Sequence, residues 1–207
     1  MKNLILAIVG SFSIVLDVNA SIINGDFELR NSGFTSQYSY ANLNTTEGEY
    51  TVRSDPQNWN SAFFSMPDHT SGTGNMMVVN GAPIGNLVVW EQTVAVDAFT
   101  SYGFSAWVSS AVADGPANLI VKINGTTLSS SFLAPSITGT WENLIRTWNS
   151  ESTSSATIQI LDINTAIFPN DFYLDDLALT AVPLPAPFWL LGSGIVGLLA
   201  IRKRAYN

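Results

Sequence analysis

The chain contains no cysteine and only one histidine, His69. Disulfide bonds are therefore excluded, and so are zinc sites that need cysteines or a pair of histidines. The folded chain must be held together by its hydrophobic core, with or without the help of a bound ion.

A sustained helical pattern is also missing from residues 21–181. This segment instead has short alternating apolar runs bounded by Gly, Asn, Asp and Ser, a pattern typical of antiparallel strands. The expected strands are residues 76–79, 86–96, 102–110, 118–123, 144–148, 157–163 and 172–180. Asn80-Gly81 and Asn124-Gly125 end two of them with hairpin chemistry. We expect an all-β fold, an antiparallel β-sandwich of jelly-roll type.

The longest hydrophobic runs lie at the two ends. Residues 1–20 have a basic start, an apolar stretch and small residues before the end, which predicts a secretory signal peptide cut after Ala20. An uncleaved N-terminal anchor is the alternative. Residues 188–201 predict a transmembrane helix, for which a buried C-terminal helix is the alternative. A basic stop that stays cytoplasmic follows: Arg202, Lys203 and Arg204. Residues 21–181 then form one exported domain between two flanking helices.

The C-terminal segment, residues 182–207, begins Val182-Pro183-Leu184-Pro185-Ala186. With the apolar run and the basic stop, it resembles the PEP-CTERM class of bacterial sorting signals, and more narrowly the subclass named for the letters V-P-L-P-A. Leu184 stands where the commoner form has glutamate. The resemblance implies an exosortase-type transpeptidase as partner, a membrane enzyme of Gram-negative bacteria that make exopolysaccharide. It would cut near the motif and pass the domain from the inner membrane to the cell surface or extracellular matrix.

Positive charge is scarce between the two ends. Residues 21–181 hold 15 acidic and only 4 basic side chains, a formal net charge of −11. Such a surface repels phosphate backbones and anionic lipid, so nucleic acid is not expected as a partner. Divalent cations and neutral polysaccharide are compatible with it.

Acidic residues recur at both ends of the expected domain. Asn24-Gly25-Asp26-Phe27-Glu28 opens it, and a strand carrying Asp175-Asp176 closes it. This layout is similar to the galactose-binding-like jelly rolls, which include many carbohydrate-binding modules. In those folds the first and last strands lie side by side and often hold a structural calcium. The resemblance implies calcium at Asp26, Glu28 and Asp175 or Asp176; a solvated sheet end without an ion is the alternative.

Exposed aromatic side chains are the other candidate ligand-binding feature, because sugar rings stack on tryptophan and tyrosine. Alternation along residues 102–110 places Trp107 with Gly103 and Ser105 on the polar face of its strand. Trp107 is therefore the main candidate. Trp59 and Tyr38, in polar segments that read as loops, are further candidates, and core packing is the alternative for each.

No catalytic motif is apparent. His69 lies in a Gly/Ser/Thr-rich segment without a nucleophile elbow, where a turn that caps its own backbone is expected. A strand with paired catalytic carboxylates is absent too. We therefore expect no enzyme and no organic cofactor. The expected role is that of a structural or adhesive surface protein linked to exopolysaccharide. A carbohydrate-binding module is the alternative, and a polysaccharide hydrolase or lyase a less favoured one.

Overall fold

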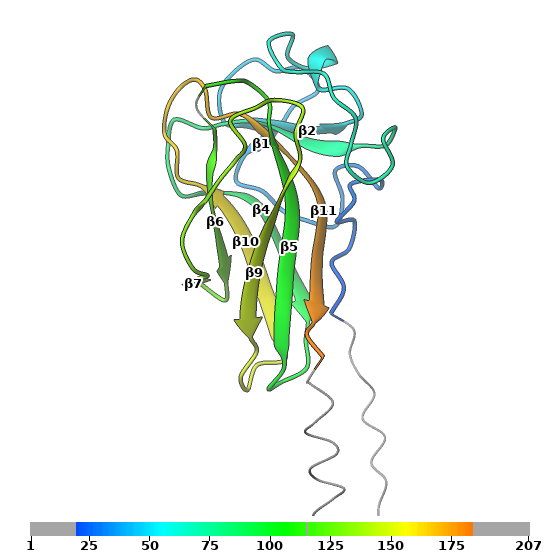
Figure 1. Cartoon of the computed structure of the whole chain (residues 1–207), viewed down its shortest axis with the longest axis vertical. Helices are drawn as coiled ribbons and strands as arrows, with labels where there is room; N and C mark the ends of the chain where they lie inside the picture. The colour runs from blue at the N-terminus through cyan, green and yellow to red at the C-terminus, as the bar shows by residue number, and fades with distance from the viewer. Residues whose placement is uncertain (1–19, 115, 184–207) are drawn as a thin grey trace, which may run out of the picture.

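The computed structural model describes residues 20–114 and 116–183 (Figure 1). The predicted signal peptide up to residue 19 and the predicted tail from Leu184 onward lie outside these residues. The flanking helices that we predicted are therefore not shown. Within the described residues no helix is both long and apolar enough to cross a membrane. The described residues contain a short 3-10 turn, Pro56–Asn58.

Two sheets face one another (Figure 1). One has six strands in the order β1 (Ser39–Tyr40), β2 (Glu49–Arg53), β3 (Met76–Asn80), β11 (Phe172–Ala181), β5 (Ser101–Ser110) and β9 (Glu142–Asn149). The other has the order β4 (Leu87–Ala95), β10 (Ser155–Asp162), β6 (Asn118–Ile123) and β7 (Thr126–Thr127), and β8 (Phe132–Leu133) also pairs with β6. The predicted β-sandwich is confirmed, and each of the seven predicted strands is present within a few residues of its expected bounds.

Alternating side chains explain why these segments pair as a sandwich. Along β5, Tyr102, Phe104, Ala106 and Val108 are all completely buried between the sheets, while the residues between them face outward up to Trp107. Burying large apolar side chains from both sheets in this way supplies the main stabilisation of the fold. From β3 to β6, and again from β8 to β11, successive strands alternate between the two sheets, as strands of jelly rolls do.

The two Asn-Gly dipeptides have different roles. Asn124 and Gly125, with φ of 50° and 79°, make the tight turn that joins β6 to β7, as predicted. Asn80-Gly81 does not form the expected hairpin, because the chain leaves β3 and crosses to β4 in the other sheet. A Cβ atom on Gly81 would lie 2.2 Å from Oδ1 of Asn170, so packing rather than turn geometry requires glycine there.

The opening segment of the domain lies against β11 in the six-stranded sheet. The N–H of Leu177 donates to the carbonyl of Gly25 at 2.9 Å. A Cβ atom at Gly25 would lie 2.1 Å from the carbonyl oxygen of Leu177, so glycine allows this close approach. The beginning and the end of the domain are therefore adjacent, as the layout of the sequence predicted.

This close approach predicts that Gly25→Ala destabilises the domain. The added methyl group meets backbone, which cannot rotate away, so the free energy of unfolding should fall by about 1–3 kcal/mol. Urea denaturation of the purified chain measures it. Gly103→Ala is the control, because its Cβ atom would meet no atom closer than 3.9 Å and the cost should stay within about 0.5 kcal/mol. Equal urea midpoints for the two variants would contradict the prediction.

Candidate functional site

A β-bulge in β11 brings two carboxylates to one side of the six-stranded sheet. Asp175 pairs with Trp107 of β5, but the next paired residue is Ala178, opposite Ser105, so β11 contains one extra residue. Asp176 takes up the irregularity with φ of 47°. Because of this extra residue, Asp175 and Asp176 both reach the same loop, residues 68–74.

Two consecutive residues of that loop bind both carboxylates. The backbone N–H groups of His69 and Thr70 donate to Oδ2 of Asp175 at 2.7 and 3.2 Å. The hydroxyl of Thr70 donates to Oδ1 of Asp176 at 2.7 Å, and Nδ1 of His69 lies 2.5 Å from Oδ2 of Asp176. These contacts fix the loop against β11 from a distance of more than a hundred residues in sequence.

Asp68 organises the rest of the loop. Its carboxylate accepts the backbone N–H groups of Ser71 and Gly74, each at 2.7 Å. The prediction that this Gly/Ser/Thr-rich segment is a turn capped by its own side chains is confirmed. His69 is therefore held in place from both sides, by the capped loop and by Asp176.

The ring of His69 completes an aromatic cluster. It stacks on Trp107 with ring centres 3.9 Å apart and planes 17° from parallel. Trp141 meets the same ring edge-on at 5.8 Å, and its indole N–H donates to the carbonyl of Pro67 at 3.3 Å. All three rings are partly accessible to solvent. The sequence analysis missed His69 and Trp141 as members of this cluster.

Trp107 lies on the outer face of its sheet, as alternation predicted, but Trp59 and Tyr38 do not. Trp59 is only 4% exposed and packs with Phe63 beneath the connection between β2 and β3, and Tyr38 is only 5% exposed in the main core. The expectation that these two present a free ring to a ligand is wrong. Polar neighbours in the sequence did not make these two side chains exposed, because both pack into hydrophobic clusters of the folded chain.

The sheet beyond Trp107 is open and has small side chains. The outward positions of β5 are Ser105 and Gly103, which pair with Ile145 and Thr147 of β9. Ile145 is 59% exposed, so nothing in the described structure covers this part of the face. We call the surface formed by Gly103, Ser105, Trp107, Asn143, Ile145, Thr147, Ala178 and Thr180 the β5 face.

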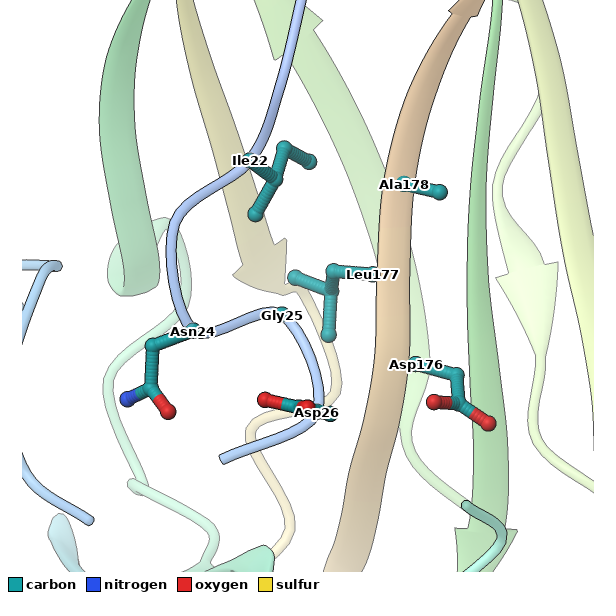
Figure 2. A pocket seen from close by; sticks show the side chains of 7 residues that line it. All are labelled: Ile22, Asn24, Gly25, Asp26, Asp176, Leu177 and Ala178. Atoms are coloured by element: carbon teal, nitrogen blue, oxygen red, sulfur yellow. The ribbon is translucent and has the colours of Figure 1, made fainter. Parts of the chain in front are cut away.

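The four predicted calcium ligands lie near one another but have separate roles. Asp26 and Asp176 line a pocket of about 310 Å³, in which their side chains point in opposite directions (Figure 2). Oε1 of Glu28 accepts the backbone N–H of Asn75 at 2.7 Å, and Asp175 is bound by the loop. Across residues 20–114 and 116–183, no three histidine or acidic side chains are grouped as metal ligands. Calcium at this place stays a prediction.

Asp175 is the most perturbed group at the site. Its side chain is completely buried, and this burial raises the pKa of Asp175 to about 7. The neighbouring charge of Asp176 acts in the same direction, whereas the backbone N–H groups of Asp176, His69 and Thr70 stabilise the anion and limit the rise. Asp175 therefore changes its protonation near neutral pH, directly beneath the His69–Trp107 stack.

No protein-family model matches the sequence, and no curated protein is significantly similar to it. Solved structures share its fold. An apo-form cyclase from Fischerella sp. gives a TM-score of 0.59 at 16% identity, over 82% of this chain and 98% of that one. The Stig cyclase Fisc from Fischerella sp. TAU, in complex with an indole compound, gives 0.58 at 15% identity, over 81% and 99%. The tandem of CBM22 carbohydrate-binding modules from Paenibacillus barcinonensis Xyn10C gives 0.52 at 13% identity, over 84% of this chain and 50% of that one.

At these identities the likeness shows the fold alone. It overturns our expectation that the chain is not an enzyme, because the sandwich that it shares with these proteins is the fold of cyclases as well as of carbohydrate-binding modules. The expectation rested on catalytic motifs along the sequence, which do not report side chains that meet only in the folded chain, as His69 and Asp176 do.

The raised pKa of Asp175 predicts how stability depends on pH. The folded chain holds the proton up to about pH 7, whereas an unfolded aspartate releases it near about pH 3.9, so the free energy of unfolding should fall as pH rises through this window. Asp175→Asn keeps an oxygen acceptor but cannot ionise, so its profile should be flatter. Urea unfolding at several pH values measures both chains. Identical slopes for the two would contradict the prediction.

Proposed function

We propose that the domain binds a neutral polysaccharide on the β5 face, with Trp107 as its centre. The observation that carries the proposal is the partly exposed indole of Trp107, fixed by His69 and followed by a strip of small side chains. Sugar rings lay their C–H faces on such indoles, and small neighbours leave room for the rest of the chain. The fold that the domain shares with carbohydrate-binding modules supports this reading.

Charge selects the kind of polysaccharide. The partly exposed carboxylate of Asp176 lies beside the His69–Trp107 stack and can accept hydrogen bonds from sugar hydroxyls. The net charge of −11 over residues 21–181 repels uronic acids, sulfate and phosphate. A neutral glycan therefore fits this surface better than an anionic one.

His69 has a positioning role in this proposal. Asp176 and the loop hold His69, and His69 holds one face of the Trp107 indole. A ring that is already immobile loses little conformational entropy when a ligand stacks on it. Trp107 stays partly accessible to solvent beside this contact, which leaves indole surface for the sugar.

Binding should depend on the indole of Trp107. In a titration of the purified chain with neutral polysaccharides, followed by tryptophan fluorescence, Trp107→Ala should weaken binding by at least about tenfold, or about 1.4 kcal/mol. Trp107→Phe should retain part of it. The control is Trp148→Phe, because Trp148 packs against Tyr102 in the main core. Undiminished binding by Trp107→Ala would place the ligand elsewhere, and no binding by the wild type would reject the proposal.

A second function, acid–base catalysis on the bound glycan, is favoured by the close pair of His69 and Asp176 next to the buried carboxyl of Asp175. An imidazole in contact with a carboxylate is a pair of groups that acid–base catalysis uses. The titration samples also test this function. New reducing ends that form with the wild type and not with His69→Gln would show hydrolysis. An unchanged glycan would contradict catalysis and would leave binding as the function of the site.

Export and sorting complete the proposal. The predicted signal peptide and the V-P-L-P-A segment support delivery of residues 21–181 to the cell surface or extracellular matrix by an exosortase-type enzyme. A displayed glycan-binding domain would link the cell to its exopolysaccharide. Cell fractionation tests this part: a chain found in the cytoplasm with both ends intact would contradict it.

A further inference from the structure

A second group of buried polar side chains lies at the end of the sandwich remote from the chain ends. There the connection between β10 and β11, residues 163–171, passes the connection between β3 and β4, residues 81–86 (Figure 1). Both connections cross from one sheet to the other. None of the residues in this group belongs to the site around Trp107.

Four oxygen atoms in this group are buried without a hydrogen-bond partner. They are Oδ2 of Asp162, Oδ1 of Asn170, Oε2 of Glu47 and Oδ1 of Asn118. Eight side-chain atoms in the described residues are unpaired in this way, and these four are the carboxylate and amide oxygens among them. Asp162 is 2% exposed and Asn170 is fully buried, so bulk solvent does not reach their unpaired oxygens.

Hydrogen bonds join three of these residues, Asn118, Asp162 and Asn170, through Asn164. The backbone N–H groups of Asn118 and Asn164 donate to Oδ1 of Asp162 at 3.0 and 2.9 Å, which leaves its Oδ2 free. The amide of Asn170 donates to the carbonyls of Asn164 and Ala82 at 3.2 and 3.3 Å, which leaves its Oδ1 free. Asp162 and Asn170 each therefore make hydrogen bonds through one side-chain atom, while the second, an oxygen, has no partner.

Negative charge gathers at the same place. Asp171 is buried beside Asn170 and accepts the N–H of Gly81 at 2.9 Å. Burial raises the pKa of Asp162 to about 6 and that of Asp171 to about 7, and the charges of Glu47 and Asp162 add to the rise at Asp171. Glu47 and Asp162 therefore each repel Asp171, and no ion pair found among the described residues involves any of the three.

We propose that this end of the domain binds a calcium ion through Asp162, Asn170 and Glu47, with Asn118 and Asp171 beside it. Calcium takes carboxylate and amide oxygens in irregular arrangements, so it suits oxygen donors from several loops. The ion would satisfy the unpaired oxygens and cancel the repulsion among the carboxylates. This site differs in every residue from the calcium position predicted at Asp26, Glu28 and Asp175 or Asp176.

A cation here would join the two sheets at their loops. Glu47 precedes β2 in the six-stranded sheet, whereas Asp162 ends β10 and Asn118 begins β6 in the other sheet. In a chain without disulfides, such a crosslink limits how far these connections can open. Calcium should therefore stabilise the folded chain.

The test is thermal unfolding of the full chain, purified after treatment with a chelator, with and without added calcium chloride. At a calcium concentration about a hundredfold above the dissociation constant, the melting temperature should rise by about 5–10 °C. Asp162→Asn and Glu47→Gln each remove one charged ligand and should weaken calcium binding by at least about tenfold. Glu28→Gln is the matched control and should keep the full shift.

Terbium luminescence gives a second readout that does not depend on the melting transition. Terbium bound by the wild type should be displaced by calcium, and its emission should be lost in Glu47→Gln and kept in Glu28→Gln. Glu47 is half-buried, so this variant decides the matter if Asp162→Asn does not fold. The proposal is overturned if calcium leaves the wild type unchanged, if Glu47→Gln responds like the wild type, or if Glu28→Gln alone abolishes the effect.

Discussion

The bulge in β11 is the constraint on which the candidate binding face depends. In a regular strand, successive side chains point to opposite faces, so Asp175 and Asp176 could not both contact one loop. The extra residue between the pairs Asp175–Trp107 and Ala178–Ser105 removes this restriction. Both carboxylates then hold His69 and Thr70, and the loop carries the imidazole onto Trp107. An irregularity of one residue thus determines the geometry of an aromatic cluster built from three separate segments.

The alternation of apolar and polar residues in the sequence predicted the strands, the sandwich and the outward position of Trp107. It missed β2, because four of its five residues are buried and no polar face remains to be seen. Glu49 looks like a surface residue in the sequence but is buried, where its carboxylate accepts hydrogen bonds from Thr45. The partnership of His69 with Asp176 spans 107 residues. No local pattern encodes a contact that depends on the whole fold.

Two groups of buried acids solve the problem of burying charge in different ways. Asp175 lies under a loop whose N–H groups donate hydrogen bonds to its carboxylate. At the other end, Asp162 and Asn170 each make hydrogen bonds through one side-chain atom, while Oδ2 of Asp162 and Oδ1 of Asn170 have no partner. The domain that carries both groups has the same fold as cyclases and carbohydrate-binding modules. Side chains, and not the fold, therefore decide what such a domain does.

The place of β11 in its sheet has a mechanical consequence. The strand lies between β3 and β5, and the described chain leaves the domain from its end, beside the end where the opening segment enters (Figure 1). Tension applied through Pro183 would run along the axis of β11. Its ladder with β5 would then be sheared as a whole, because the hydrogen bonds lie across the pull and share the load. Peeling them one after another needs a pull in a different direction. A pull in this direction therefore meets the resistance of the whole β5–β11 ladder at once.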